Sequence, residues 1–593
     1  MYATAGIASV LAFAVAVMGQ RKSRLDLGPA GLALVLFTAW TALGIAWSAA
    51  PYMSVIELGV AASALALYAI CRASGPQASN FPVCGFVFGV SALIALAILV
   101  QAALGFTPRA MLLNPNSAAG FLNFAWPIAA LAALRPDVGA RTRSIACVVL
   151  FFMMIALAIG GSRGAMLGAI ASLCVIAFIA AAVFKQRRAA FGLALLVCAA
   201  FVLADWIGGG LVTAGIDSMR NPALAGASRL DIWSSAWEMI RQHPWLGFGP
   251  GVFWIAYPAF RSASDQSSGY FVHNDYLEFW IEGGVPLLAI VVFLGVACLY
   301  LFVRSLRDYR QGTIDRPRFH VALACFTGIL GVAVHSAVTF NLQLMPFVLV
   351  AALLVAALER ASSVSPVVSL RVPRRPTRLL PAAGVALLLL VPVVHFARTA
   401  VALEYIDSGS QYMARDAYSN AATAFSRSRL VWSQPDGAWY MHANVIVEAL
   451  RSNPDASDSN RRELVRQANH LLDRAEERNP HRATTPLIRG LLRADHPDLT
   501  DGTAEASLRR ALRLDPRNIE ARYALSQVIA RNGDLRSALQ LVKEGLAIEY
   551  RSGVNIAPLH RQIEALESRI NDTAPGAAPL PAPDSDETRS RYY

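Results

Sequence analysis

Charged residues are scarce in this sequence, and cysteines are absent from large parts of it. Only 16% of its 593 residues are charged, whereas 55% are hydrophobic, which excludes an ordinary soluble protein. No CxxC pair or cysteine–histidine spacing indicates zinc, and we predict neither a bound metal nor a cofactor. The seven cysteines fall in or beside apolar segments, so they supply no disulfide framework for the polar parts of the chain. They are Cys71, Cys84, Cys147, Cys174, Cys198, Cys298 and Cys325.

The chain has instead a series of apolar runs up to Thr399, each about 20 residues long and able to cross a bilayer. We predict an all-α fold, in which a polytopic transmembrane bundle of about twelve spans is followed by a soluble α-solenoid. The expected spans are 3–19, 29–49, 54–70, 81–101, 117–134, 144–160, 165–184, 190–206, 277–303, 319–340, 343–359 and 379–399.

The basic charge of the protein belongs to the membrane part. Residues 1–399 contain 27 Lys and Arg against 14 Asp and Glu, whereas the remainder contains 25 against 26. The high pI, about 9.6, therefore reflects loops between spans, and we expect no nucleic-acid partner. Most basic clusters fall on one side of the threaded spans, which is cytoplasmic by the positive-inside rule. The N-terminus then starts outside, which suggests a short or truncated first segment, and the loop at 207–276 and everything after Thr399 lie outside the cytoplasm.

The soluble part contains an internal repeat. The pattern Ala-x3-Leu-x2-Ala-x4-Pro spans 468–480, returns at 504–516, and recurs more loosely as Ala538, Val542 and Gly545. Its spacings of 36 and 34 residues resemble the tetratricopeptide period, although a generic stack of helical hairpins is an alternative. We expect a transmembrane domain at 1–399, a repeat domain at 400–570 and a disordered tail at 571–593. Repeat arrays of this kind bind partners rather than catalyse.

A glycine-rich turn at 160–168 joins two expected spans, and Arg163 is its only charged residue. One interpretation is an arginine that reaches to lipid headgroups. The other is a guanidinium that holds a membrane-anchored pyrophosphate, since its planar fork donates two parallel hydrogen bonds to phosphate oxygens.

The long outer loop contains further candidates. Residues 228–245 read as a helix with apolar residues on one face, lying in the membrane interface and carrying Arg229 and Arg241 to headgroup depth, or simply packed on the protein. The next stretch, 243–251, is rich in turn residues and is expected to fold back. His273 follows, and can act as a general base or hold structure; His273-x-Asp275 is alternatively half a metal site. The residues of the apolar face are Leu230, Trp233, Trp237 and Ile240.

In their order along the chain, these motifs resemble the O-antigen ligase and O-antigen polymerase superfamily of bacterial envelope enzymes. The resemblance covers about 110–350, and it departs at Thr339, where relatives often have an acidic residue. The core motifs are Gly161-Ser162-Arg163-Gly164, Arg229-x3-Trp233-x3-Trp237, Pro244-x2-Gly247-x-Gly249-x-Gly251-x-Phe253, and His273-Asn274-x2-Leu277 with Glu282-x-Gly284. Supporting stretches are Asn114-Pro115-Asn116, His335-Ser336 and Asn341-Leu342-Gln343.

The resemblance implies a metal-independent glycosyltransferase in the bacterial inner membrane that works at its periplasmic face. Arg163 and Arg229 would clamp the diphosphate of an undecaprenyl-linked donor, and His273 would accept the proton of the acceptor hydroxyl. The implied partners are a lipid-linked oligosaccharide or polysaccharide donor, a glycan, lipid A-core or protein acceptor, membrane lipids, and a protein recruited by the repeats. The implied substrate-binding residues are Arg241, Asn274, Glu282, Asn116 and His335.

Three alternatives remain open from the sequence. A polymerase of the same superfamily would pass the glycan to another lipid-linked repeat unit, and the motifs do not name the acceptor. A transporter or flippase is less consistent, because the notable polar groups lie at the outer rim rather than at the bilayer midplane. A non-catalytic scaffold would present the repeats outside the cell membrane without needing His273.

Overall fold

The structure of the chain is a computed structural model that describes residues 24–73, 81–210, 213, 227–265, 267, 269–371, 379–453, 457–548, 550 and 554–571. Within these residues the chain is almost entirely helical, apart from one antiparallel pair of short strands, β1 (Arg24–Leu27) and β2 (Val368–Arg371). The prediction of an all-α fold is confirmed in this sense. The predicted span at 3–19 and nearly all of the predicted tail lie outside the described residues.

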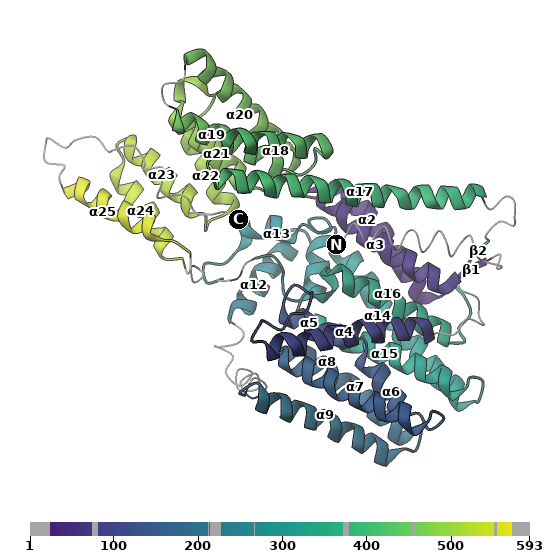
Figure 1. Cartoon of the computed structure of the whole chain (residues 1–593). Coiled ribbons are helices and arrows are strands. Elements are labelled where there is room, and N and C mark those ends of the chain that lie inside the picture. Colours follow the sequence, from purple (N-terminus) through teal and green to yellow (C-terminus); the bar gives the residue numbers. More distant parts are fainter. Residues whose placement is uncertain are drawn as a thin grey trace.

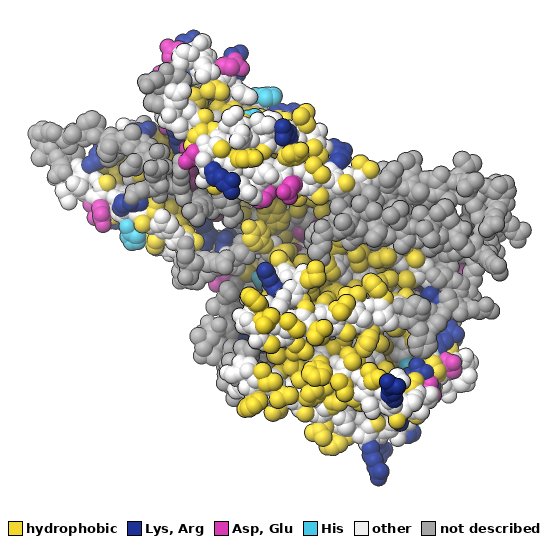
Figure 2. Space-filling view, viewed as in Figure 1, with side chains coloured by type: hydrophobic (Ala, Val, Ile, Leu, Met, Phe, Trp, Pro, Cys, Tyr) yellow, Lys and Arg dark blue, Asp and Glu magenta, His cyan; other side chains and the backbone are white. Residues whose placement is uncertain are grey.

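A bundle of apolar helices makes up the first part of the chain, and hydrophobic side chains cover much of its surface (Figures 1 and 2). In the described residues, eight helices are long and apolar enough to cross a membrane, which identifies a multi-pass membrane protein. They are α2 (Pro29–Gly44, continued by η1, Ile45–Trp47), α3 (Pro51–Ala73), α4 (Phe81–Ala103), α7 (Ala140–Ile159), α8 (Arg163–Ala182), α9 (Arg187–Ile207), α14 (Asp275–Arg310) and α15 (Arg316–Ser336).

The predicted total of twelve spans is not confirmed. The segment expected to span at 117–134 is two helices of eight residues each, α5 (Pro115–Leu122) and α6 (Trp126–Ala133). Buried Asn123 lies at the break, where it accepts from the indole of Trp126 at 3.1 Å and donates to the carbonyl of Ala165 at 3.1 Å. Pro127 follows in the first turn of α6, where its missing N–H costs nothing. The last two expected spans correspond to α16 (Met345–Ala361) and the first part of α17 (Leu379–Met413).

The two ends of the bundle carry different structures. At one end, which we call the sheet side, arginines donate to backbone carbonyls of strand β1 and of the last turns of α3 and α16. Arg72 donates to the carbonyl of Asp26 at 3.2 Å, Arg360 to that of Cys71 at 3.0 Å, and Arg318 to that of Ala361 at 2.9 Å. The opposite end, the repeat side, lies next to the C-terminal helices (Figure 1). The gathering of basic residues at the sheet side agrees with the predicted threading, while the orientation in a membrane stays a prediction.

Helices α8 and α15 cross closely because glycines line their contact. A methyl group on Gly168 would overlap the backbone carbonyl of Gly331. Ser172, one turn further along α8, donates to the carbonyl of Thr327 at 2.7 Å. These contacts fix the start of α8 against the end of α15, and both meet at the repeat side.

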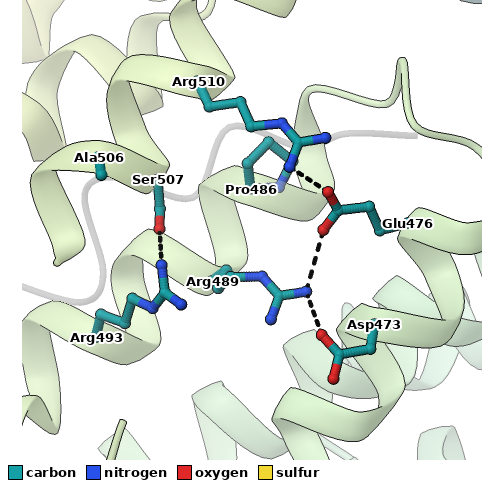
Figure 3. Close-up of a pocket in the computed structure, with 8 residues that line it drawn as sticks. All are labelled: Asp473, Glu476, Pro486, Arg489, Arg493, Ala506, Ser507 and Arg510. Carbon is teal, nitrogen blue, oxygen red and sulfur yellow. Dashed lines mark hydrogen bonds and ion pairs between the residues drawn. The ribbon is translucent and has the colours of Figure 1, made fainter. Parts of the chain in front are cut away.

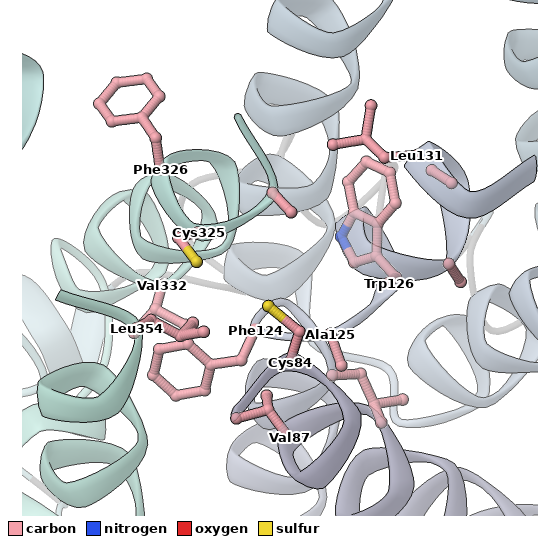
Figure 4. Close-up of a cluster of buried hydrophobic side chains, with 14 of the residues drawn as sticks. Cys84, Val87, Phe124, Ala125, Trp126, Leu131, Cys325, Phe326, Val332 and Leu354 are labelled. Carbon is pink, nitrogen blue, oxygen red and sulfur yellow. The ribbon is translucent and has the colours of Figure 1, made fainter. Parts of the chain in front are cut away.

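A buried apolar cluster closes the centre of the bundle (Figure 4). Phe124, at the break between α5 and α6, packs on Phe121 and Phe347 at 5.7 Å between ring centroids in each case. Cys84 of α4 and Cys325 of α15 lie side by side in the same cluster. The broken helix is therefore part of the core rather than a surface loop.

The C-terminal helices form an array of antiparallel pairs beyond α17. The expected domain boundary at 399–400 falls inside α17, which continues without a break into the array. The other helices are α18 (Tyr418–Val431), α19 (Gly437–Ser452), α20 (Asp458–Arg478), α21 (Thr484–Asp495), α22 (Ala504–Leu514), α23 (Ile519–Arg531), α24 (Leu535–Leu546) and α25 (Ala557–Asn571).

The repeat motif accounts for the core of this array. Most of its apolar positions are buried, whereas Ala504 is half-buried. Pro480 and Pro516 directly follow the C-cap residues of α20 and α22. Asn532-Gly533-Asp534 is the turn between α23 and α24, with φ of +95° at Gly533. The buried motif residues are Ala468, Leu472, Ala475, Leu508, Ala511, Ala538 and Val542.

Ion pairs tie three helices of the array together around a pocket of about 340 Å³ (Figure 3). Arg489 of α21 contacts Asp473 at 2.9 Å and Glu476 at 3.3 Å, both on α20. Glu476 also pairs with Arg510 of α22. Arg493 donates to Ser507 at 2.6 Å. These guanidinium groups already have partners, because their ion pairs and hydrogen bonds hold α20, α21 and α22 together. The pocket is therefore first of all part of the packing of these three helices.

Candidate active site at the repeat side of the bundle

Arg163 is the first residue of α8, directly after a tight turn at the repeat side. Gly161 has a φ of +64°, a conformation that favours glycine. Ser162 is the N-cap, and its Oγ accepts from the N–H of Ala165 at 3.3 Å. The positive end of the helix dipole therefore lies beside the Arg163 side chain. It favours an anionic ligand at this place.

His335 is buried behind this turn, with protein partners at both ring nitrogens. It is 1% exposed, with Nε2 3.1 Å from Ser162 Oγ and Nδ1 2.9 Å from Asn341 Nδ2. A methyl group on Gly120 or Gly164 would overlap its imidazole, so the two glycines make the space for the ring. His335 therefore positions the turn that carries Arg163.

His273 lies in the loop before α14 with a backbone conformation that is rare for a non-glycine residue. Its φ is +59°. Its ring contacts the edge of Phe340 at 5.0 Å between centroids, and Phe271 stacks on Phe340 at 4.0 Å. The N–H of Val272 donates to Glu278 Oε2 at 3.0 Å. The contacts on both sides keep His273 in a strained conformation of the kind that clusters at functional sites.

Two more side chains hold the same loop. Trp233 of α12 (Ala227–Gln242) donates its indole N–H to the carbonyl of Val272 at 3.1 Å. Asn274 is the N-cap of α14, because its Oδ1 accepts from the N–H groups of Tyr276 and Leu277 at 3.0 and 3.2 Å. The amide oxygen of Asn274 therefore serves the helix, which the motif alone did not reveal.

Arg163, Arg229 and His273 come from three separate elements and act on one another electrostatically. Burial, and after it the positive charge of Arg163, lowers the pKa of Arg229. Burial, and after it Arg229, lowers the pKa of His273 to about 4, against a weaker opposite effect of Asp265. The three side chains therefore share one neighbourhood, and the imidazole is neutral at pH 7.

No acidic side chain forms an ion pair with Arg229 in the part of the chain that the structure describes. Two guanidinium groups near each other repel unless an anion lies between them. Ser162 and the N-terminus of α8 add donors on the same side. The arrangement can therefore bind a group with several negative charges, such as a diphosphate.

Of the remaining predicted substrate contacts, Arg241 and Glu282 have partners within the protein. Arg241 is exposed at the end of α12, with its guanidinium 3.8 Å from Glu238. Glu282 is buried and accepts from the backbone N–H of Phe253 at 3.2 Å. Asn116 is exposed in the first turn of α5. Asn116 lies close to the Arg163 turn, because the neighbouring carbonyl of Pro115 faces Gly160.

The turn-rich stretch at 243–251 folds back on the start of α14, as expected from its composition. Gly247, Gly249 and Gly251 have φ values of +69°, +110° and +73°. The N–H groups of Phe248 and Gly249 donate to the carbonyls of Ile281 and Glu282 at 2.8 and 2.9 Å. Gly284, with φ of +68°, kinks α14 against the same stretch. The stretch at 243–251 and the first turns of α14 therefore pack against each other.

The helix predicted at 228–245 forms as α12, which ends at Gln242. Of the predicted apolar face, Leu230 and Trp237 are 59% and 45% exposed, whereas Ile240 is 3% exposed and is buried beside Ile232 and Met239. Trp233 supports the His273 loop. Trp233 and Ile240 therefore pack on the protein, while the location of Leu230 and Trp237 in the membrane interface stays a prediction.

Comparison with known proteins identifies the family to which the region around this site is similar. Residues 148–292 match the family described as O-antigen ligase. The chain carries an O-antigen ligase domain. No curated protein matches the chain significantly. Among solved structures, a tetratricopeptide-repeat protein of Thermus thermophilus gives a TM-score of 0.26 at 22% identity, covering 32% of this chain and 94% of that protein. Yeast Tom70 gives 0.21 at 12% identity, covering 77% and 92%.

The O-antigen ligase match begins in α7 and ends in α14, so it includes Arg163, Arg229 and His273. It implies a glycosyltransferase-type activity on lipid-linked glycans. His335 and Asn341 lie beyond it, although both support the Arg163 turn. Sequence reasoning also missed Ser162 as the cap of α8, for which its place before a helix start was the available signal.

Proposed function

We propose that the chain transfers a glycan from undecaprenyl diphosphate to an acceptor hydroxyl, at the periplasmic face of a bacterial inner membrane, in the manner of an O-antigen ligase. One observation carries this proposal: two guanidinium groups and a neutral imidazole, drawn from three elements, lie together where the bundle meets its outer loop. Arg163 and Arg229 hold the diphosphate, and His273 accepts the proton.

The reaction needs one bond to form and one to break. The acceptor oxygen attacks the anomeric carbon, the bond from that carbon to the diphosphate oxygen breaks, and its electron pair leaves on the diphosphate. Arg163 and Arg229 stabilise this charge more strongly in the transition state than before it. The proton of the acceptor hydroxyl goes to His273. Because positioning and charge stabilisation suffice for such a leaving group, no metal is required.

The low pKa of His273 in the resting protein fits this sequence of events. Burial and Arg229 keep the imidazole neutral, so it is ready to take a proton. A diphosphate bound at Arg229 brings negative charge close to the imidazole, which raises its pKa and strengthens the base. Donor binding thus prepares the base for the acceptor.

The test is transfer in cells that carry single variants. His273→Asn and Arg229→Gln are expected to abolish transfer of glycan while the protein stays in the membrane at its normal level. Arg304→Gln is the matched control, since Arg304 lies toward the opposite end of α14 and pairs with Asp308 at 3.1 Å. Wild-type activity of both site variants would refute the proposed chemistry.

The acceptor is decided by what accumulates when the protein is lost. Free polymer indicates a ligase, which we favour because a second macromolecule can be recruited by the repeat array. Single lipid-linked repeat units indicate a polymerase of the same superfamily. Lipid-linked glycan that accumulates at the cytoplasmic face would instead indicate a transporter.

A further inference from the structure

The repeat array touches the membrane part with one edge. Its helix pairs are joined by turns after α18, α20 and α22, and each turn contains a proline, at Pro435, Pro480 and Pro516. The residues next to these prolines contact the outer loop between α12 and α14 or the start of α3. The array is therefore fixed to the membrane part along this edge.

The first contact is a hydrogen bond from Tyr52 of the membrane part to a buried ion pair of the array. Asp436, 1% exposed, accepts from Tyr52 at 2.7 Å, from Arg482 Nε at 2.7 Å and from Asn479 at 3.0 Å. Trp432 packs on the ring of Tyr52 at 6.1 Å between centroids. A buried charge with this many partners indicates a fixed joint rather than a loose encounter.

The second contact lies two turns further along the array. Arg517 donates from one nitrogen to the carbonyls of Ser262 and Ala263 at 2.9 and 3.0 Å. The same short segment is bound to α12, since the N–H of Ser262 donates to Ser235 at 3.2 Å and Ser264 donates to Asp231 at 2.8 Å. Two joints thus hold the array and the outer loop in one arrangement.

A cleft of about 100 Å³ lies between the two joints. The outer loop supplies Trp254, on α13 (Phe253–Ala256), and Pro258. The turns of the array supply the polar side, with a hydroxyl, an imidazole, a guanidinium and a carboxyl group. These are Thr484, His481, Arg482 and Asp515.

The chemistry of this cleft suits a hydroxylated ring better than an anion. Asp436 neutralises Arg482, whose guanidinium lies over the indole of Trp254 at 5.2 Å. Burial, and then His243 and Arg510, lowers the pKa of His481, which favours the neutral form of this imidazole. What remains is an aromatic wall with separate hydrogen-bond donors and acceptors, which matches a sugar ring with an apolar face and hydroxyl edges.

Aromatic side chains connect the cleft with the candidate active site. The ring of Trp254 lies 6.4 Å from that of Tyr270, and Tyr270 is 59% exposed. Tyr270 is three residues before His273 and next to Phe271, which stacks on the same phenylalanine as His273. A chain of sugars that starts at His273 can therefore run over exposed aromatic rings to the cleft.

We infer that the cleft between Trp254 and the turns of the repeat array is a glycan-binding subsite, which takes a sugar of the substrate remote from the anomeric carbon that reacts. The inference rests on the proposed function, because it assumes a glycan at His273. It gives the repeat array a part in substrate binding, through its fixed edge.

Binding of a soluble oligosaccharide tests the subsite apart from catalysis. The probe is the oligosaccharide released by mild acid from the host's own lipid-linked glycan, titrated into the full chain in lipid nanodiscs and followed by calorimetry. Thr484→Val and Trp254→Leu are each expected to weaken binding at least fivefold. Thr423→Val on α18 and Trp206→Leu, 80% exposed at the end of α9, are the matched controls and are expected to bind as wild type.

The outcomes separate this inference from the proposed function. Wild-type binding by both cleft variants, or no binding by the wild-type chain, overturns the subsite. His273→Asn is expected to keep oligosaccharide binding and lose transfer; if it keeps both, the proposed chemistry fails while the subsite stands. Thr484→Val removes one hydroxyl without loss of volume, so a thermal unfolding midpoint equal to wild type shows that its effect is on the ligand.

Discussion

The phenol of Tyr52, in the first turn of α3, donates a hydrogen bond to Asp436 of the repeat array at 2.7 Å, although the two residues are 384 positions apart in the chain. This contact joins a membrane helix to a repeat turn in a buried environment. Asp436 also forms an ion pair with Arg482. The hydrogen bond from Tyr52 therefore links this ion pair of the array to the membrane part.

Tyr52→Phe is expected to loosen this joint without emptying the core. The ring still packs on Trp432, but buried Asp436 loses one donor, which costs about 1–3 kcal/mol. We expect faster amide hydrogen exchange in α19, measured on the full chain in nanodiscs. Tyr412→Phe at the exposed end of α17 is the control, and equal exchange in the two variants would contradict a fixed joint.

Gly164→Ala is expected to disturb the site through His335. A methyl group there meets the imidazole that holds Ser162, and the first turn of α8 must move to relieve the overlap. Transfer is therefore expected to fall on the order of tenfold or more, about 1.4 kcal/mol or more in transition-state free energy.

The matched control for that variant is Gly192→Ala. Gly192 lies in α9, and a methyl group there meets nothing within 4 Å. It is expected to leave transfer unchanged and to raise helix propensity slightly. If both variants lost transfer to a similar extent, the loss would come from any added methyl group in these helices and not from the His335 contact.

The features that could be predicted from the sequence are those written in local patterns. Apolar runs of the right length gave the long helices, and the alanine and leucine positions of the repeat motif gave the core of the array. The turn before Arg163 and the joint between 243–251 and Gly284 could be expected from their glycines. The gathering of Arg163, Arg229 and His273 was expected from the family resemblance rather than from spacing.

The features that could not be predicted depend on contacts between distant segments. Nothing near Tyr52 or Asp436 in the sequence indicates that they meet. The break between α5 and α6 depends on the bond from Asn123 to Ala165 of another helix. The sequence left open which side chains of α12 pack on the protein, because the cluster around Ile240 includes residues of α3, α13, α14 and α17, which are distant in the chain.

The pH dependence of transfer follows from the position of His273. Its pKa in the resting protein, about 4, is below the ordinary value, so the neutral base is present above that pH and is lost as the pH falls through it. We expect kcat/KM, which reports the free enzyme, to keep its acid limb near pH 4. The acid limb of kcat is expected at higher pH, because the bound diphosphate raises the pKa of the imidazole. If the acid limbs of kcat and kcat/KM coincided near pH 6.5, the result would argue against a buried base beside Arg229.

Arg229→Lys tests whether the geometry of the guanidinium matters beyond its charge. Lysine keeps the positive charge but lacks the planar fork that grips two phosphate oxygens at once. We expect transfer to fall on the order of 10- to 100-fold, or about 1.4–2.7 kcal/mol. We also expect the acid limb of kcat/KM to stay close to pH 4, because a charge still acts on His273. Arg304→Lys is the control at the sheet side. If Arg229→Lys transferred glycan at the wild-type rate, the diphosphate would be held by charge alone, and the paired arginines would be no more than an electrostatic attraction for the donor.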